Sequence, residues 1–584
     1  MAPSGDTMAP STLSEMPPST LSENHVIPDN LPPPAEDDRR SKGTCRDRIG
    51  CEYSRRSRDF WTYAIGFILL MIGMVCLVFV LYDHPSLVGK DKMSVQKNVT
   101  KDADDNALAP SRNASAAYYR ELRLAVIHQI HHGLIDPYVF VRPNSPQRMA
   151  MQWMAFKDPL HLPLNGSRWI QRYALMTIYF ANDGDKWTVF AGDSSKPTAL
   201  PNTNIQEEQQ VVAAIVSPKL SSVVHMVTEN GSPWSEQAGI HECQFALVQC
   251  DKDDRVVSAA WSGDLASLSG TLIKEIGLLS HLRHLDVSQN QLRGKIPKEL
   301  FDLTHLERLD LSFNEFVSTI DPLIGRFSNL THLNLKRTHF SGQLPSTLQD
   351  LTNLEVFHMG SNPEGLGGPV LNYAVHWKNV KVLELLGSAT WGTIPSELGL
   401  LTQLTGIAFL NTFVSGTIPT ELGQLKALKQ IYLGSNYPSK SVVGTLPTEI
   451  GSLTSLEVFS CQQVELTGTI PSEVGKWSNV KTFHLWNSGG IQGTLPSELG
   501  RMTKLRLLWI FDTEISGAIP SELGLLSDAS EMKFHSTKLE GTMPEEICDL
   551  PLQSLSADCS SSVEGSTPEL VCEVGTCCSE CYST

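Results

Sequence analysis

The sequence predicts an α/β solenoid joined to a single membrane-spanning helix and a disordered N-terminal tail. A tetrapeptide, Gly-x-[Ile/Leu/Met]-Pro, recurs at a nearly fixed spacing through the second half of the chain. A fixed period in this range indicates a stack of similar units rather than one compact domain. The second observation is a long uncharged run over residues 60–82. The third is that residues 1–38 are rich in Pro, Ser and acidic residues, a composition that cannot form a core.

The repeated tetrapeptide divides the second half of the chain into about twelve units. Degenerate copies begin at Gly270, Ser318 and Gly368, and longer loops widen the spacing at some steps. The clear copies begin at Gly294, Gly342, Gly392, Gly416, Gly444, Gly468, Gly493, Gly517 and Gly541. No single unit is able to bury its own apolar face, so we expect all of them to stack.

One unit, residues 282–297, reads L-x-x-L-x-L-x-x-N-x-L-x-G-x-I-P. Leu285 and Val287 alternate with polar residues, which predicts one short strand per unit with its apolar side turned inward. Stacked strands of this kind form a parallel sheet that advances by about 4.8 Å per unit. In the following segment we expect Gly294 to allow a tight backbone and Pro297 to fix φ.

This unit resembles the plant-type leucine-rich repeat, which implies an α/β leucine-rich repeat solenoid over residues 263–550. Such solenoids are usually binding surfaces. The Asn of each unit is expected to bond the backbone of the turns in a ladder along the stack, and Asn290, Asn314, Asn362 and Asn436 occupy this position. Val464 takes the same position without a polar group, so we expect a less regular ladder there.

Residues 145–262 are expected to cap the N-terminal end of the stack. Ser145 followed by Pro146 predicts the start of a helix. Residues 172–187, which include Gly-Asp-Lys-Trp, followed by Cys243 and Cys250, resemble the N-terminal cap of plant-type repeats. This resemblance implies a helix and a Cys243–Cys250 pair. Residues 188–233 form a longer loop than in that family, and residues 145–159 resemble a segment of single-pass repeat proteins of diatoms.

A cysteine-rich stretch, residues 551–584, is expected to cap the other end. Six cysteines crowd this region and its margin: Cys548, Cys559, Cys572, Cys577, Cys578 and Cys581. Either a metal knot or disulfides fit the pattern, with fifteen possible pairings if all six are joined. An oxidising compartment, argued next, favours disulfides both here and at Cys243 and Cys250. Cys461 lies at an inward strand position and is expected to be buried and unpaired.

Residues 60–82 are long enough to span a bilayer. Eight Lys or Arg residues precede this run within 39–58, whereas four follow within 90–101. The excess predicts that residues 1–59 are cytosolic and that the repeats are extracellular or lumenal, most simply at the plasma membrane. A secretory signal peptide is the rival interpretation. It is disfavoured because the run starts late and lacks a small-x-small cleavage site.

Two further features concern the segment after the span. Residues 83–144 are expected to form a stalk with a possible short helix. All the glycosylation sequons follow the span, as the predicted topology requires. They are Asn98, Asn113, Asn165, Asn230 and Asn329.

The sequence predicts no enzyme and no cofactor. Residues 1–59 are too few for a kinase domain, and the chain contains no kinase motif, P-loop or Gly-x-Ser-x-Gly. A net charge of −17 argues against a nucleic-acid partner. Two clusters raise the question of a metal: His128, His131 and His132, and the loop 251–254 with Asp251, Asp253 and Asp254. We expect an amphipathic helix and a hydrated loop instead, and no metal site.

The strands also predict which side chains face away from the core. Phe483 and Leu485, then Leu508 and Ile510, form inward pairs, so their neighbours face outward. Aromatic and histidine side chains gather in this outward row, and such clusters are typical of recognition sites. The candidate ligand-binding residues are Tyr432, His484, Trp486, Trp509, Phe511 and His535. The alternative is that these rings cover one another or shield the C-terminal cap.

These features favour a receptor-like cell-surface protein that binds a peptide, a protein or a glycan on its concave face. Residues 1–59 would then offer a site for a cytosolic partner. A structural role in adhesion, or in organising extracellular matrix or wall, is the first alternative. A membrane-tethered inhibitor of foreign hydrolases, like soluble plant-type repeat proteins, is the second.

Overall fold

The computed structural model describes residues 112–131, 142, 144–182, 240–263, 266–435, 441–558, 570–572 and 577–582. The chain divides into two units, 1–105 and 106–584, and every described residue belongs to the second. The expected tail 1–59 and span 60–82 lie outside the described residues. Among the helices that the structure does describe, none is long and apolar enough to cross a membrane.

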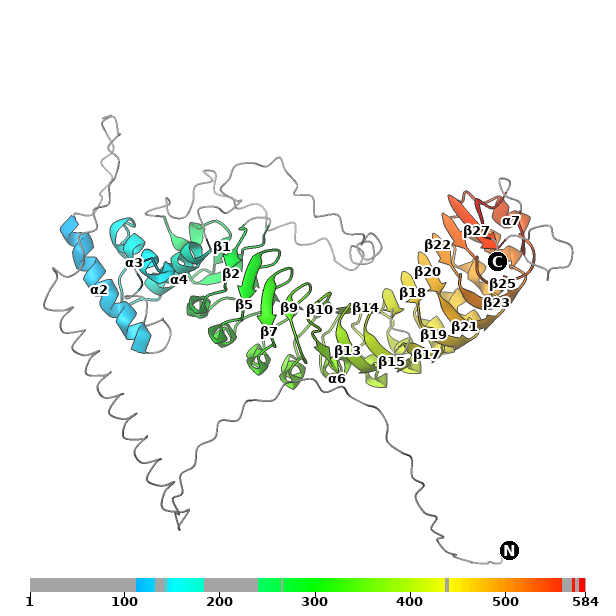
Figure 1. Ribbon diagram of the computed structural model, residues 1–584, viewed down its shortest axis with the longest axis horizontal. Coiled ribbons are helices and arrows are strands. Elements are labelled where there is room, and N and C mark those ends of the chain that lie inside the picture. Colours follow the sequence, from blue (N-terminus) through cyan, green and yellow to red (C-terminus); the bar gives the residue numbers. More distant parts are fainter. Residues whose placement is uncertain are drawn as a thin grey trace, which may run out of the picture. The chain divides into compact units, whose positions relative to one another are not determined.

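One long sheet organises the described part of the chain. Its strands follow one another in sequence order and line the concave side of the stack (Figure 1). Neighbouring strands are parallel except for the first pair, which is antiparallel. The strands are β1 (Val248–Cys250), β2 (Val256–Ala260), β4 (His284–Asp286), β6 (Arg308–Asp310), β8 (His332–Asn334), β10 (Val356–Gly360), β12 (Val382–Leu386), β14 (Gly406–Leu410), β16 (Gln430–Gly434), β18 (Val458–Gln462), β20 (Thr482–Trp486), β22 (Leu507–Trp509), β24 (Glu531–Lys533), β27 (Ser554–Asp558) and β29 (Glu580–Tyr582).

The strand register repeats the same position from one strand to the next. Leu285 of β4 pairs with Leu309 of β6, and both side chains are buried. Val287 is also buried, so the inward pair predicted by the alternating pattern is confirmed. Cys461 is likewise buried and is not in a disulfide, as its inward position predicts.

Shorter strands and 3-10 helices return the chain to the next strand of the long sheet. Gly416 has a φ of +81°, and Pro419, with φ −67°, directly precedes a 3-10 helix. The roles expected for the Gly and Pro of the repeat are therefore confirmed. The 3-10 helices are η5 (Lys274–Leu278), η6 (Lys298–Asp302), η7 (Pro322–Arg326), η8 (Ser346–Asp350), η9 (Ser396–Leu400), η10 (Thr420–Gln424), η11 (Thr448–Ser452), η12 (Ser472–Lys476), η13 (Ser497–Arg501) and η14 (Ser521–Leu525), with α6 (Val370–Ala374) in place of one of them.

The short strands pair among themselves in two parallel sheets on the other side of the stack. The first holds β3 (Ser269–Gly270), β5 (Gln291–Gly294), β7 (Glu315–Ser318) and β9 (His339–Phe340). The second holds β11 (Gly367–Gly368), β13 (Ala389–Thr393), β15 (Phe413–Thr417), β17 (Val442–Thr445), β19 (Glu465–Gly468), β21 (Ser488–Gly493), β23 (Thr513–Gly517) and β25 (Lys538–Leu539).

Buried asparagines link the turns, as the repeat predicts. The side-chain oxygen of Asn290 accepts from the backbone N–H of Leu268, and that of Asn314 accepts from Leu292. Asn362 bonds the backbone in the same way, whereas Asn436 lies outside the described residues. Asp558 closes the ladder at the C-terminal end, where both of its carboxylate oxygens accept backbone N–H groups.

Three helices lie at the N-terminal end: α2 (Arg112–His131), α3 (Pro146–Phe156) and α4 (Arg168–Ala181). Ser145 caps α3 by accepting from the backbone N–H of Arg148, as expected. Helix α2 is longer than the short helix expected in the stalk, and the hydroxyl of Tyr118 donates to the carbonyl of Leu162 at 2.9 Å. Residues 112–131 therefore pack within this helical end, whereas residues 83–111 of the predicted stalk lie outside the described residues.

The long sheet continues past residue 550 into the cysteine-rich end. Leu555 and Ala557 of β27 form one more buried inward pair. Helix α7 (Glu545–Cys548) precedes β27 in the chain. The short strand β26 (Gly541–Thr542) pairs with β28 (Leu570–Val571), which follows β27. Disulfides join Cys548 to Cys577 and Cys572 to Cys578. Cys559 and the side chain of Cys581 lie outside the described residues.

Candidate recognition surface on the long sheet

Four rings from four repeats stack along the outward face of the sheet, with β27 between the strands of the last two. They are Trp486, Phe511, His535 and Tyr582, which we call the ring stack. The centroids are 5.3 Å apart between Trp486 and Phe511, 4.5 Å between Phe511 and His535, and 4.2 Å between His535 and Tyr582. Their planes are inclined by 9°, 24° and 26°, respectively. The parallel register brings Trp486, Phe511 and His535 of adjacent repeats into line, and Tyr582 joins them from the strand beyond β27, so each ring covers the faces of its neighbours.

A second row runs beside the ring stack. His484 of β20 pairs in register with Trp509 of β22, and Trp509 pairs with Lys533 of β24. The imidazole stacks on the indole at 4.2 Å, and the ammonium of Lys533 lies 4.1 Å from the centroid of the indole ring. We call these three residues the indole sandwich. Phe511 links the two rows, because its ring lies 6.4 Å from that of Trp509.

Burial controls the protonation of the histidines in this cluster. It lowers the pKa of His484 to about 3, helped by the positive charge of Lys533. Burial also lowers the pKa of His535, although the nearby carboxylates of Asp512 and Asp558 oppose this. His484 is therefore a neutral imidazole at physiological pH. Its Nε2 and the Nε1 of Trp509 are buried and form no hydrogen bond with any described residue.

The structure brings together five of the six predicted site residues, all except Tyr432. The side chain of Tyr432 is 5% exposed and packs with Leu386, Ala408 and Leu410. The expectation that Tyr432 is an accessible outward ring is therefore corrected, because neighbouring outward positions carry large aliphatic side chains that cover it. Tyr582 is the residue that sequence reasoning missed. It follows the cysteine-rich stretch, where the spacing of the repeat no longer indicates which residues share a row.

An ion group in the middle of the same face also escaped the sequence analysis. Glu384 is 0% exposed, and its two carboxylate oxygens lie 2.7 Å from Nζ of Lys336 and 2.5 Å from Nδ1 of His358. Burial raises the pKa of Glu384, but the hydrogen bond from His358 and the charge of Lys336 outweigh this, so the pKa is lowered. All three residues occupy outward positions of consecutive repeats. They form a charge cluster in which the Glu384 carboxylate lies between Lys336 and His358.

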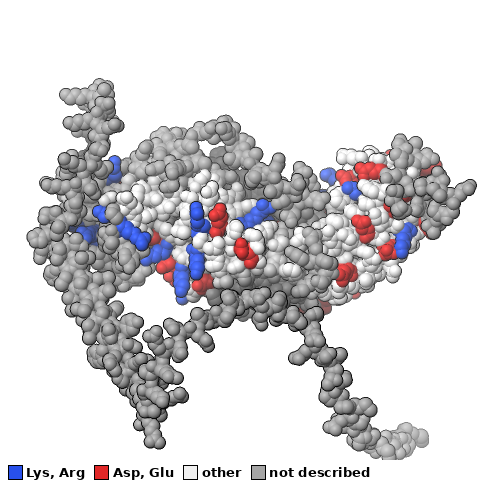
Figure 2. Space-filling model, viewed as in Figure 1, with Lys and Arg blue, Asp and Glu red and all other residues white. Residues whose placement is uncertain are grey.

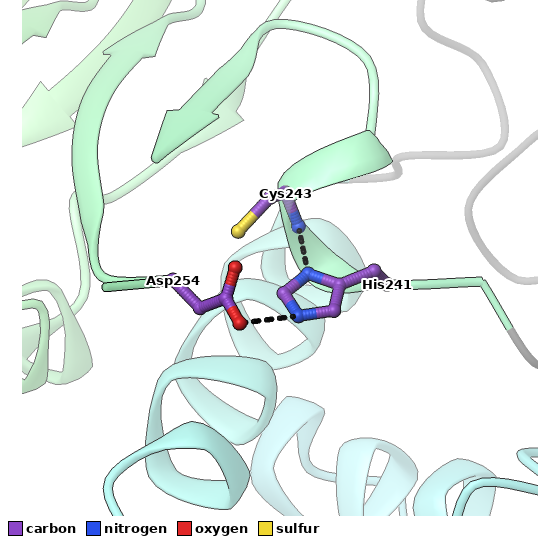
Figure 3. A group of neighbouring side chains, drawn as sticks. All are labelled: His241, Cys243 and Asp254. Carbon is purple, nitrogen blue, oxygen red and sulfur yellow. Dashed lines mark hydrogen bonds and ion pairs between the residues drawn. The ribbon is translucent and has the colours of Figure 1, made fainter. Parts of the chain in front are cut away.

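One group of possible metal ligands occurs in the described residues, formed by His241, Cys243 and Asp254 (Figure 3). The sulfur of Cys243 is bonded to Cys250, which confirms the predicted pair and prevents it from acting as a thiolate ligand. The Nδ1 of His241 accepts the backbone N–H of Cys243 at 3.2 Å, and its Nε2 lies 3.4 Å from Asp254. One imidazole nitrogen and one carboxylate remain, which is too few for a zinc site.

The other two clusters weighed for metal binding have protein partners or are incomplete. Asp251 and Asp253 both pair with Arg255, whose side chain holds the loop. The hydrogen bond from Arg255 also lowers the pKa of Asp251 to about 2. His128 lies on α2, whereas the side chain of His131 and the whole of His132 lie outside the described residues.

Comparisons with known proteins agree with the repeat architecture. The family model described as Leucine Rich repeats (2 copies) matches residues 280–325, and that described as Leucine Rich Repeat matches residues 329–351. These stretches are therefore leucine-rich repeats. No curated protein matches the chain.

Among solved structures, the chain resembles PEPR1–AtPEP1 with 28% identity and a TM-score of 0.46, over 54% of this chain and 46% of that one. It resembles a TDR receptor with 27% identity and a TM-score of 0.45, over 52% and 57%. It also resembles the Arabidopsis receptor kinase HAESA in complex with the peptide hormone IDA and the co-receptor SERK1, with 24% identity and a TM-score of 0.46, over 56% and 59%. The chain thus spans about half the length of these structures. At such TM-scores the likeness transfers no ligand to this chain.

Proposed function

We propose that this protein is a membrane-anchored recognition protein whose ring stack and indole sandwich bind a protein or peptide ligand. The observation that carries the proposal is the concentration of six half-buried or exposed rings at one end of the outward face, fixed by stacking. Aromatic side chains held in one conformation lose little entropy on binding, and Trp and Tyr are enriched among the few residues that dominate the energy of protein interfaces.

The stacking favours a protein or peptide over a glycan. A sugar ring binds best on the open face of an aromatic ring, but here the inner faces are already covered by neighbouring rings. Trp509 has His484 on it at 4.2 Å and the Lys533 ammonium 4.1 Å from its ring centroid. What remains accessible is mainly ring edges, which pack well against the side chains of a polypeptide.

The anchoring part of the proposal rests on the sequence. Residues 60–82 have the length and composition of a membrane span, and the charge asymmetry orients residues 1–59 toward the cytosol. With this orientation the repeats face the cell exterior or a lumen, where disulfides such as Cys243–Cys250 persist. Signalling would then require a cytosolic partner for residues 1–59 that binds only when the ligand is present.

Site-specific crosslinking tests the proposed surface directly. The full chain is expressed in its own cells with a photo-reactive phenylalanine in place of Phe511. The matched control carries the same residue in place of Trp391, which is 49% exposed and lies on β13 in the second sheet of short strands. We expect a protein partner to be crosslinked from position 511 and not from position 391. Equal crosslinking from both positions, or none from position 511, contradicts the proposal. Crosslinks only between copies of this chain on adjoining cells would indicate adhesion, and a crosslinked secreted hydrolase would indicate an inhibitor.

A further inference from the structure

The residues that directly precede the strands of the long sheet form another row, at the edge of the sheet, which we call the entry row. In order these residues are Arg283, Glu307, Thr331, Glu355, Lys381, Thr405, Lys429, Glu457, Lys481 and Arg506. In its first half the charges are balanced in one-to-one pairs. Arg283 lies 3.2 Å from Glu307, and Lys381 lies 2.7 Å from Glu355. Exposed pairs of this kind contribute little to stability, but they leave no net charge.

The balance ends in the second half of the entry row. Lys429 and Lys481 share a single carboxylate, that of Glu457, at 3.4 Å and 2.7 Å. Arg506 is exposed and forms no ion pair with a described residue. Beside this row, Lys504 donates to the side-chain oxygen of Asn479 at 2.8 Å and also has no carboxylate partner in the described part of the chain. Four cations therefore accompany one carboxylate.

Three of these cations line a groove of about 320 Å³, which is formed by Lys429, Ser455, Glu457, Asn479, Lys481 and Lys504. The side chains of Lys429 and Lys481 are 56% and 50% exposed, so their ammonium groups are accessible to an incoming anion. On the face seen in Figure 2, residues of both signs are interspersed. In a chain with a net charge of −17, a local excess of positive charge around a groove is a feature that attracts anionic partners.

We propose that this groove binds the carboxylates of an acidic segment of the ligand. This rests on the proposed function, in which the ligand is a polypeptide. Lys481 directly precedes β20 and Trp486 ends it, so the groove and the ring stack are separated by the length of one strand. A strand of this length spans about 17 Å, which one bound segment is able to cover. The ligand would place side-chain carboxylates in the groove and apolar side chains against the rings.

The test uses the purified full chain in neutral detergent and a short fluorescent poly-L-glutamate as the acidic probe. We expect the Lys481→Ala/Lys504→Ala variant to weaken probe binding at least about fivefold, because two of the three cations that line the groove are lost. Binding should also weaken between about 50 and 300 mM salt, because exposed charges are screened. Glu457→Gln should tighten binding, since it removes the one carboxylate from the groove. Lys381→Ala, in a balanced pair of the first half, should leave binding unchanged.

The outcomes separate this proposal from its rivals. If the entry row is only a ladder of stabilising ion pairs, Glu457→Gln lowers the melting temperature without tightening probe binding. In that case the double variant also binds the probe as tightly as the wild-type chain does. Either result overturns the proposal. Tighter binding of dextran sulfate than of poly-L-glutamate, lost in the same double variant, would also overturn it in favour of a sulfated glycan. Because the probe carries no aromatic group, a failure of the ring surface would leave this test intact.

Discussion

The imidazole of His484 lies nearly parallel to the indole of Trp509, with the ring centroids 4.2 Å apart and the planes inclined by 13°. Because the two residues are in register on neighbouring strands, the backbone of the sheet sets this contact. Lys533 adds its ammonium to the same indole. Trp509 is therefore fixed before any ligand arrives, and because its Nε1 is buried, its ring edge is what it offers to a partner.

We expect Trp509→Ala to weaken ligand binding at least about tenfold, because an aromatic anchor at the centre of an interface typically contributes about 2 kcal/mol or more. The inward pair Leu508 and Ile510 remains unchanged, so the repeat should still fold and reach the cell surface. The measurement is the dissociation constant of the crosslinked partner once it has been identified.

The matched control is Asp286→Ala, at the far end of the same sheet. Its carboxylate accepts the backbone N–H of Ser288 and lies many repeats away from the rings, so affinity should not change. If Trp509→Ala instead prevents folding while any surviving protein binds with full affinity, the rings serve packing, and the ligand site lies elsewhere on the solenoid.

Acid should destabilise the fold through His484. Its pKa is lowered by burial to about 3, so the stability that depends on a neutral imidazole is fully present above pH 6.5 and is lost as the pH falls toward 3. His484→Phe keeps a ring on Trp509 but does not titrate. Between pH 7 and pH 5 we expect the unfolding free energy of the wild-type chain to fall by about 2 kcal/mol more than that of the variant. Urea denaturation of both proteins at the two pH values measures this difference, and parallel losses would contradict the assignment.

The repeat pattern alone predicts most of the solenoid. Leu285 and Val287 are buried as the alternation requires, and Asn290 and Asn314 form the ladder. This succeeds because every repeat supplies the same local information, so one correctly interpreted unit gives the register of the others. The five rings of the candidate site follow from the same register.

The remaining features depend on contacts that the period does not encode. Tyr432 is outward but buried, because Leu386 and Leu410 happen to be large at flanking outward positions. Tyr582 joins the ring stack after a cysteine-rich stretch in which the period is lost. Glu384 draws its partners from two other repeats, and no spacing rule indicates that Lys336 and His358 will meet it.

The Cys243–Cys250 bond should stabilise the N-terminal cap. It closes a short loop between η4 (Glu242–Gln244) and β1, and in the chain-entropy description such a loop contributes about 2–3 kcal/mol. We expect Cys243→Ser/Cys250→Ser to lower the cap's resistance to limited proteolysis while the distant repeats remain protected. Mass mapping of a non-reduced digest should find the two residues joined, and free thiols at both positions would rule out this contribution.

Glycosylation should report the topology. Asn165 and Asn329 are both exposed, and both lie on the side of the predicted span that is expected to face the exterior. Endoglycosidase treatment should increase the mobility of the full chain, and Asn165→Gln/Asn329→Gln should reduce the shift. In a second measurement, the chain carries a tag at its N-terminus, and an antibody should not label this tag on intact cells. No shift together with a surface-labelled tag would invert the proposed orientation.

The last prediction concerns Arg172, whose side chain is fully buried in the cap. Its Nε donates to Asp158 at 2.6 Å, Nη1 donates to the carbonyl of Ile240, and Glu242 lies 3.6 Å away. The guanidinium also lies 5.1 Å from the ring centroids of both Trp153 and Phe245. One side chain on α4 thereby ties together α3, the segment after it and the start of η4.

Arg172→Met should destabilise the cap by about 3–5 kcal/mol, because Asp158 is left buried without its charge partner. Adding Asp158→Leu removes the stranded carboxylate and should restore part of the loss, since Glu242 keeps its bidentate contact with Arg168. Thermal unfolding of the single and double variants measures both steps. If Arg172→Met melts like the unchanged chain, the ion network contributes nothing to stability. If the double variant is no better than the single one, the loss comes from the packing of Arg172 against the two rings rather than from the stranded charge.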